Sequence, residues 1–370
     1  MSHTPASPAP QSTAHFAVVW ADPARQSHFE TWFAAAQAAH GLQAETLRLA
    51  SADASFRRYL RVDSPQGSRI IMDAPPDKEN CQPFVHVAAL MQAAGLLVPQ
   101  VLDWDEAQGF LLLSDLGHQT MMQVINPVAP PPLDLYLQAV DALVQWQLAS
   151  RPDQLPPYDE ALLRRELELF PQWYLTAHRK VDIDAAVRKT LDGAFAHIIQ
   201  NNLAWPSVYV HRDFMPRNLM VPVDSATSVR AALGVLDFQD AVYGPITYDI
   251  ASLMRDAFLS WEEDFCLDVT IRYWEKARKA GLPVGNDFGE FYRGVEWMGL
   301  QRHLKIAGIF ARLTLRDGKP QYLADTPRFI GYLRTTCNRY RELKPLLWLI
   351  ENVEGIASSN ILAYNKPQAK

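Results

Sequence analysis

The sequence predicts an α+β protein with two lobes, a small β-rich N-terminal lobe and a larger, mainly helical C-terminal lobe. Two observations support this prediction. Short strand signals bounded by turn residues gather in the first part of the chain, whereas apolar residues recur at helical spacing through most of the remainder. The pattern changes after Leu116-Gly117, where a proline-rich patch follows. We therefore expect a disordered tail over residues 1–15, an N-terminal lobe over 16–116 and a C-terminal lobe over 117–370.

The bulk composition is that of an ordinary soluble protein. With 370 residues, 48% of them hydrophobic, the chain can bury a sizeable core. A net charge of -6 gives no electrostatic footprint for nucleic acid or for an anionic membrane. The three cysteines lack the spacing of a metal site or a disulfide framework. No apolar run could cross a bilayer and no signal-peptide pattern is present, so we expect a cytoplasmic protein.

Each predicted element of the N-terminal lobe has a recognisable boundary. One helix ends at Gly41, and a second helix has proline at its first position and ends at Gly95. Two strands around a longer polar turn form a hairpin, and two more strands follow. The expected ranges are His28–His40, Phe56–Asp63, Arg69–Ala74 with the turn Ser64–Ser68 before it, Pro83–Ala94, Pro99–Asp103 and Gly109–Leu113.

In the C-terminal lobe, apolar residues at helical spacing predict the helical segments Leu133–Ala149, Tyr158–His178 and Ile183–Gln200, and helices again from Ile250 onward. One β-rich insert, Leu219–Asp237, interrupts this pattern. Within it we expect strands over residues 219–223 and 229–236, joined by a polar turn over 224–228.

Candidate catalytic residues flank this predicted hairpin. Asn218 comes directly before the first strand and Asp237 directly after the second, so both should lie at the same end of the hairpin. A carbonyl oxygen and a carboxylate close together suit Mg²⁺, which takes few protein ligands plus nucleotide phosphates. Asp213, in the segment His211-Arg212-Asp213, can then accept the proton of an attacking hydroxyl. This pattern indicates phosphoryl transfer, in which the protein mainly positions reactants and stabilises charge.

These residues resemble a known group of enzymes. The segments 211–218, 236–240 and 244–251 are similar to the aminoglycoside phosphotransferase-like kinase superfamily. The resemblance implies a bilobal protein-kinase-like fold and the use of ATP and Mg²⁺. It implies that Asp213 is the catalytic base and that Asn218 and Asp237 bind the metal. Asp249 would brace the catalytic loop as a buried carboxylate, and His211 would anchor the loop by hydrogen bonding.

The nucleotide site is less complete in the sequence. Residues 111–117 resemble the hinge between the lobes, where the backbone of Leu113 and Ser114 would bind adenine. Residues 51–59 stand where a phosphate-covering loop is expected, with small residues in place of glycines. The hydroxyl of Ser55 and the backbone amides of this segment could serve the phosphates.

The lysine usual on the third strand is missing, because Met72 stands at its place. Either the register of this strand differs from the one assumed here, or another cation serves the α- and β-phosphates, for which we consider Arg58 and Lys78 as candidates. Arg57 and Arg58 are adjacent, so in a strand they point to opposite faces and only one can face the nucleotide.

The acceptor is expected to be a small molecule. A protein kinase carries Asp-Phe-Gly followed by a long activation loop. Here the sequence is Asp237-Phe238-Gln239, and the start of a helix follows closely at Asp249. Little chain remains for an activation loop or a peptide-docking platform.

Motifs over most of the chain are similar to the kinases of N-acetylmuramate and N-acetylglucosamine in bacterial cell-wall recycling, which phosphorylate the anomeric C1 hydroxyl. They lie at residues 55–59, 72–76, 112–117 and 297–305. The resemblance implies an amino-sugar substrate, for which we consider Arg217, Trp297 and Gln301 as contacts. Two alternatives stay open: a kinase of an aminoglycoside or an amino alcohol, with the acidic run 262–264 in its pocket, and an inactive nucleotide-binding scaffold. The oligomeric state cannot be predicted from these motifs.

Overall fold

The computed structural model describes residues 18–52, 56–126, 128–222 and 232–356. They form two compact units. The N-terminal unit takes in the chain up to Gln92 together with Val98–Gly117, and the C-terminal unit takes in Ala93–Leu97 and the chain from His118. The division after Gly117 falls one residue beyond the predicted end of the first lobe. The predicted tail, residues 1–15, lies outside the described residues.

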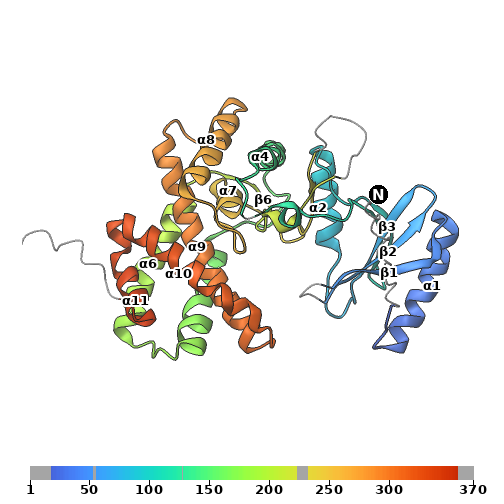
Figure 1. The fold of residues 1–370 in the computed structure, drawn as a ribbon, viewed down its shortest axis with the longest axis horizontal. Coiled ribbons are helices and arrows are strands. Elements are labelled where there is room, and N and C mark those ends of the chain that lie inside the picture. Colours follow the sequence, from blue (N-terminus) through green and yellow to red (C-terminus); the bar gives the residue numbers. More distant parts are fainter. Residues whose placement is uncertain (1–17, 53–55, 127, 223–231, 357–370) are drawn as a thin grey trace, which may run out of the picture. The chain divides into compact units, whose positions relative to one another are not determined.

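The N-terminal unit is built on a five-stranded antiparallel sheet in the order β1-β2-β3-β5-β4. Figure 1 labels β1, β2 and β3 of this sheet. The strands are β1 Gln43–Ala52, β2 Arg58–Ser64, β3 Gly67–Asp73, β4 Val101–Asp105 and β5 Phe110–Ser114. Helix α1, Pro23–His40, packs its aromatic residues Phe29, Trp32 and Phe33 on Leu60, Val62 and Ile71 of one sheet face. Helix α2 spans Gln82–Ala93.

Three features of this unit differ clearly from the prediction: strand β1 was not predicted, and the start of α1 and the hairpin turn were placed wrongly. Helix α1 begins at Pro23 rather than His28, because the Asp22 side chain accepts a hydrogen bond from the N–H of Ala24 and caps the helix. The predicted longer turn of the hairpin is wrong. Strands β2 and β3 pair up to Ser64 and Gly67, so only two residues form the turn. Gly67 has φ +105°, which favours glycine, and its carbonyl accepts a hydrogen bond from the Ser64 hydroxyl at 2.7 Å.

The C-terminal unit is mainly helical, and α9, Phe288–Leu315, is its longest described helix (Figure 1). The other helices are α3 Met121–Val124, α4 Leu133–Leu148, α5 Glu160–Leu167, α6 Ala185–Leu203, α7 Thr247–Met254, α8 Glu263–Lys279, α10 Thr326–Arg339 and α11 Lys344–Glu354. Short 3₁₀ segments are η2 Pro216–Asn218, η3 Pro320–Asp325 and η4 Arg341–Leu343. The predicted single segment Tyr158–His178 is instead α5 followed by a π-helix, η1, over Phe170–His178.

Helix α9 packs against η1, α6, α7 and α10. Its approach to η1 depends on Gly308, because a Cβ there would lie 2.3 Å from the Leu169 carbonyl oxygen. The unit therefore buries one long helix among shorter ones. No helix among the described residues combines the length and the apolarity that a membrane span needs.

Two small antiparallel strand pairs complete the C-terminal unit. Strand β6, Ser207–Val210, pairs with β9, Val242–Pro245, and β7, Leu219–Met220, pairs with β8, Gly234–Val235. The strands of the predicted insert are thus shorter than expected within the described residues. The predicted turn over residues 224–228 lies outside them. Residues 211–218, between β6 and β7, form the candidate catalytic segment.

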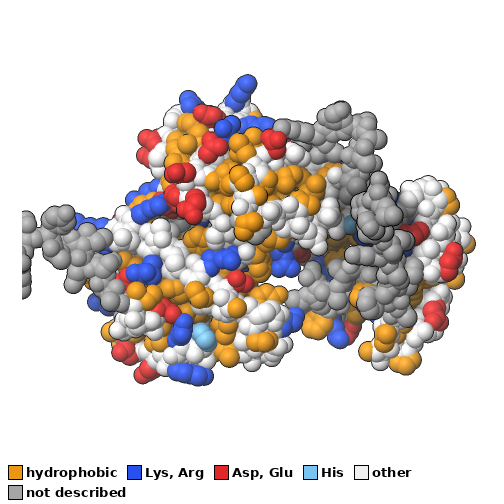
Figure 2. Space-filling view, viewed as in Figure 1, with side chains coloured by type: hydrophobic (Ala, Val, Ile, Leu, Met, Phe, Trp, Pro, Cys, Tyr) orange, Lys and Arg blue, Asp and Glu red, His pale blue; other side chains and the backbone are white. Residues whose placement is uncertain are grey.

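On the face of the molecule shown in Figure 2, the basic and acidic side chains of the described residues are interspersed. A surface of mixed charge accords with the modest net charge of -6. A broad basic surface of the kind that binds a nucleic-acid backbone is not seen among the described residues on that face.

Candidate active site

The structure brings Asp213, Asn218 and Asp237 together. The Asn218 side-chain amide donates to the Asp213 carbonyl at 2.8 Å and to Asp237 Oδ2 at 3.2 Å. The backbone N–H of Leu236 donates to the Asn218 carbonyl at 2.9 Å, which continues the pairing of β7 with β8 to the end of the hairpin. The predicted proximity of Asn218 and Asp237 is therefore present, and Asn218 also ties the catalytic segment to that end.

Asp249 and His211 hold the backbone of this segment. The buried Asp249 carboxylate, in the first turn of α7, accepts hydrogen bonds from the N–H of His211 at 2.7 Å and of Arg212 at 3.0 Å. His211 Nε2 lies 2.9 Å from the Leu236 carbonyl, and its Nδ1 accepts from the N–H of Asp213 at 3.2 Å. Since a carbonyl can only accept, Nε2 carries the ring proton. Burial lowers the pKa of His211, which keeps the ring neutral in this role.

Arg212 has a strained backbone next to the candidate base. Its φ is +77°, a conformation that costs of order 1–3 kcal/mol for a residue other than glycine and persists only where neighbours hold it. The Arg302 guanidinium donates to the Arg212 carbonyl at 2.5 Å, while Asp249 holds the Arg212 N–H. The Arg212 guanidinium lies 2.5 Å from Glu166 Oε1. Contacts at the N–H, the carbonyl and the side chain thus fix the residue before Asp213.

Glu166, on α5, is the centre of a buried charge cluster beneath the catalytic segment. We define the Glu166 cluster as Tyr158, Glu166, Arg212, Gln301 and Lys305. Besides Arg212, the Glu166 carboxylate binds Lys305 at 2.9 Å, the Gln301 amide at 3.0 Å and the Tyr158 hydroxyl at 2.5 Å. Burial alone would raise the pKa of Glu166, but Lys305 and Arg212 outweigh it and lower the pKa to about 2. Glu166 is therefore ionised and holds two cations at once.

Sequence reasoning missed Glu166, although one signal pointed to it. Leu163 lies three residues before Glu166 and Phe170 four residues after it, and both are buried, as is the adjacent Leu167. Residues three and four apart share a helix face, so a glutamate in that position lies within an apolar stripe. A carboxylate there needs a cation, and Arg212 and Lys305 supply it.

Comparison with known proteins agrees with the phosphotransferase chemistry that this geometry indicates. Residues 46–285 match the phosphotransferase enzyme family. The chain belongs to this family. Its fold is shared with a putative aminoglycoside phosphotransferase from Ralstonia eutropha, at 13% identity and a TM-score of 0.57, covering 86% of this chain and 98% of that one. It is also shared with the GDP complex of an aminoglycoside 2'-phosphotransferase, at 14% identity and a TM-score of 0.57, covering 85% and 99%.

Curated members of the family are more similar in sequence. An N-acetylmuramate/N-acetylglucosamine kinase of Neisseria meningitidis serogroup B is 48% identical over 314 residues, which are 84% of this chain and 91% of the relative. A protein of the same name from Pseudomonas aeruginosa is 48% identical over 297 residues, 80% of this chain and 85% of the relative. The predicted family, the predicted α+β kinase-like fold and the predicted phosphotransferase activity are thereby confirmed.

Phosphotransferases of this kind typically use a divalent cation, and the side chains of Asn218 and Asp237 offer oxygen ligands that suit one. Asp237 offers a carboxylate and Asn218 a side-chain carbonyl, and the two side chains are in hydrogen-bond contact. Asp237 has φ +63°, a second strained position in the site, and the Gln239 amide donates to its Oδ1 at 2.9 Å. Two oxygen ligands are few, which suits Mg²⁺ because it keeps its other positions for water and phosphate. No larger group of His, Cys, Asp and Glu placed to hold a metal occurs among the described residues.

The predicted nucleotide contacts lie in the N-terminal unit, where their roles stay predictions. Leu113 is buried in β5, opposite Ile70 of β3. The N–H of Ser114 already donates to the Gln100 carbonyl at 3.0 Å. Arg58 is bound to the buried Asp73 at 2.7 Å. Ser55 lies outside the described residues.

The predicted acceptor contacts lie in the C-terminal unit, and their roles also stay predictions. Trp297 is buried, with its ring near that of Tyr340. Gln301 is buried too and donates to Glu166. The guanidinium of Arg217, in the catalytic segment, lies 4.8 Å from the centre of the Phe258 ring. Of the three, Arg217 is the residue with some exposed surface.

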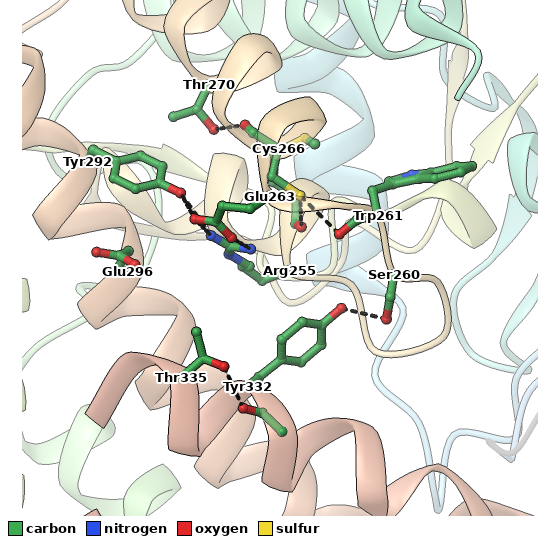
Figure 3. A network of polar contacts seen from close by, with 12 residues as sticks. Arg255, Ser260, Trp261, Glu263, Cys266, Thr270, Tyr292, Glu296, Tyr332 and Thr335 are labelled. Atoms are coloured by element: carbon green, nitrogen blue, oxygen red, sulfur yellow. Dashed lines mark hydrogen bonds and ion pairs between the residues drawn. The ribbon is translucent and has the colours of Figure 1, made fainter. Parts of the chain in front are cut away.

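A second polar network surrounds Arg255, the residue directly after α7. Figure 3 shows residues of this network, among them Arg255, Glu263 and Tyr292. Glu263 points toward Arg255, with N–O distances of 2.9 and 3.0 Å, and also binds Tyr292 and Arg339. Burial would raise the pKa of Glu263, but Arg255 lowers it to about 2. The network borders a cavity of about 110 Å³, below the roughly 300–1,000 Å³ typical of ligand pockets. The contacts of Glu263 link α8 to Arg255 after α7, to Tyr292 of α9 and to Arg339 of α10.

Proposed function

We propose that the chain is an ATP- and Mg²⁺-dependent kinase that phosphorylates the anomeric C1 hydroxyl of N-acetylmuramate and N-acetylglucosamine, yielding sugar 1-phosphates in peptidoglycan recycling. The observation that carries the proposal is the contact of Asn218 with both Asp213 and Asp237. The two relatives at 48% identity, named as kinases of these sugars and matched over most of their length, support the acceptor.

In the proposed reaction Asp213 is the base. One of its carboxylate oxygens takes the proton of the C1 hydroxyl as the hydroxyl oxygen bonds to the γ-phosphorus. The bond from that phosphorus to the β-phosphate oxygen breaks, so ADP leaves and the sugar carries the phosphate. Asn218 and Asp237 would hold Mg²⁺, which when bound neutralises charge on the phosphates. Asp249 and His211 keep the backbone of Asp213 in place.

The Arg255 network bears on the choice of acceptor. A cationic antibiotic needs free carboxylates in its pocket, and the acidic run 262–264 was a candidate source. Glu263 is instead neutralised by Arg255 and Arg339, while Glu262 and Asp264 are exposed at the start of α8. This arrangement favours an uncharged or anionic acceptor over an aminoglycoside. Against an inactive scaffold stands the complete set of Asp213, Asn218 and Asp237.

One assay tests the proposal. The purified protein is given ATP and Mg²⁺ with N-acetylmuramate, N-acetylglucosamine, an aminoglycoside or choline, and phosphorus NMR identifies the phosphorylated position. We expect a sugar 1-phosphate from both amino sugars. Turnover on a non-sugar alone, or phosphate on another carbon, would rule out the proposed reaction, and no turnover on any acceptor would favour the scaffold.

A pair of variants tests the proposed base. Asp213→Asn should lose nearly all turnover, by about 10²-fold or more, because general-base catalysis contributes about 10²–10⁴-fold. ATP binding should survive in this variant. Asp240→Asn is the matched control, since Asp240 is exposed and offers the segment only its carbonyl, 3.3 Å from Arg212 Nη1. Equal activity of the two variants would contradict the role of Asp213.

A further inference from the structure

The missing lysine of the third strand has a structural counterpart on the neighbouring strand. Met72 of β3 is fully buried and pairs with Tyr59 of β2. Directly paired residues of an antiparallel sheet present their side chains on the same face, and so do residues two apart along a strand. Arg57, two residues before Tyr59 and next to the first residue of β2, therefore belongs to the face on which Met72 lies.

Arg58 belongs to the opposite face. It pairs in register with Asp73, and the alternation along β2 places it with Leu60 and Val62, which pack against α1. Its guanidinium donates to Asp73 Oδ2 at 2.7 Å and to the Val19 carbonyl at 2.8 Å. The sheet thus separates the two adjacent arginines, and α1 covers the face of Arg58. Of these two adjacent arginines, Arg57 is the one on the face opposite α1.

Arg57 also has the partner that such a cation needs. Its guanidinium lies 3.1 Å from Glu79, which precedes α2, and both side chains are largely buried, at 10% and 17% exposure. In protein kinases the third-strand lysine that contacts the α- and β-phosphates forms an ion pair with a glutamate of the following helix. The ion pair of Arg57 with Glu79 is of the same kind, but its cation lies at the start of β2 rather than on β3. Diagonal neighbours across a sheet stand about 7–8 Å apart, which a long side chain can reach.

We propose that Arg57 binds the α- and β-phosphates of ATP in place of the absent lysine, and that Glu79 positions its guanidinium. The guanidinium suits this role because its planar fork can bind a phosphate through two hydrogen bonds while another edge holds a carboxylate. The inference rests on the proposed use of ATP. It assigns the cation that the motif lacks, and it removes Arg58 from the candidates.

The test measures nucleotide affinity directly, by calorimetry with ATP and Mg²⁺ in the absence of any acceptor. Arg57→Met should weaken ATP binding about 10- to 100-fold, the effect of losing hydrogen bonds to a charged group. Adenosine affinity should stay unchanged, because adenosine has no phosphates. Glu79→Gln should weaken ATP binding less, and Arg57→Lys should retain part of it. Arg48→Met, which removes a partly exposed arginine paired with Asp63 in the same sheet, is the control and should bind ATP normally.

A rescue variant sharpens the test. If Arg57 replaces the lysine, Met72→Lys in the Arg57→Met background should restore part of the ATP affinity, since residue 72 lies on the same face. Unchanged ATP affinity in Arg57→Met would overturn the inference, and so would a parallel loss of adenosine affinity, which indicates a structural effect. Because no acceptor is present, these results stand whether or not the sugar assignment holds. A chain that binds ATP through Arg57 but phosphorylates no sugar would refute the proposed function alone.

Discussion

The substitution Glu166→Gln removes the charge that two buried cations share while keeping the shape of the side chain. Glu166 is 4% exposed and contacts Arg212, Lys305, Tyr158 and Gln301. In the variant, the glutamine can still accept hydrogen bonds, but it no longer offsets either positive charge. Both cations then stay in the interior without their shared carboxylate.

The expected loss of stability follows from this burial. Removing one partner of a buried ion pair typically costs about 3–5 kcal/mol, because the remaining charge is left without compensation. For a unit of this size, that loss corresponds to a fall in melting temperature of roughly 6–20 °C. Arg212 precedes Asp213, so looser packing of its guanidinium should also misplace the base. We expect kcat to fall about 10- to 100-fold, with little change in the KM for ATP.

Thermal unfolding and steady-state kinetics measure the two effects. The matched control is Glu168→Gln, because Glu168 lies two residues further along the chain and pairs with Arg188 at the surface, with both side chains at least one-third exposed. An exposed pair contributes about 0–1 kcal/mol, so this control should stay close to the unmodified protein. If Glu166→Gln matches Glu168→Gln in both melting temperature and kcat, the Glu166 cluster does not hold the catalytic segment.

Two further predictions concern acid stability and backbone conformation. Burial lowers the pKa of His303 from 6.5 to about 3, so its contribution to stability is present above pH 6.5 and is lost as the pH falls toward 3. Between pH 7 and 4.5 the unmodified protein should lose about 2–3 kcal/mol more unfolding free energy than His303→Gln, and parallel curves in urea denaturation would contradict this. Gly109 has φ +68°, and a Cβ there would lie 2.0 Å from the Ala74 carbonyl oxygen. Gly109→Ala should cost more than about 2 kcal/mol. Gly67→Ala, at φ +105° but with open space around it, should cost less; equal losses would show that the close contact has no effect.

The proximity of Asp213, Asn218 and Asp237 could be predicted because these residues are close in sequence or joined by one hairpin. Asp213 and Asn218 are five residues apart, and the pairing of β7 with β8 brings Asp237 to Asn218. Local rules of strand pairing were enough for this, even though the paired strands are shorter than expected. In the N-terminal unit, four of the five strands and both helices could be predicted in order for the same reason, but the first strand, β1, was missed.

The Glu166 cluster could not be predicted, because its members come from separate parts of the C-terminal unit. Tyr158 and Glu166 lie well before the catalytic segment, while Gln301 and Lys305 lie on α9. Only the packing of α9 against the elements around α5 brings them together. Gln301 and Lys305 are four residues apart and so share one helix face, but nothing local indicates that this face meets a buried carboxylate. The π-helix at Phe170–His178 was not predicted either, because apolar residues at helical spacing do not distinguish it from an α-helix.

The contact between Arg212 and Glu166 has a consequence for control of the enzyme. In kinases that are switched by phosphorylation, a phosphate added to the activation loop pairs with an arginine, and the loop is ordered only while the phosphate is present. Here the anion that the arginine of the catalytic segment binds is an encoded side chain with a pKa of about 2, so it is charged at every physiological pH. This contact needs no modifying enzyme to form and no phosphatase to break. Reversible phosphorylation of the activation-loop kind therefore has no role in forming or breaking this contact.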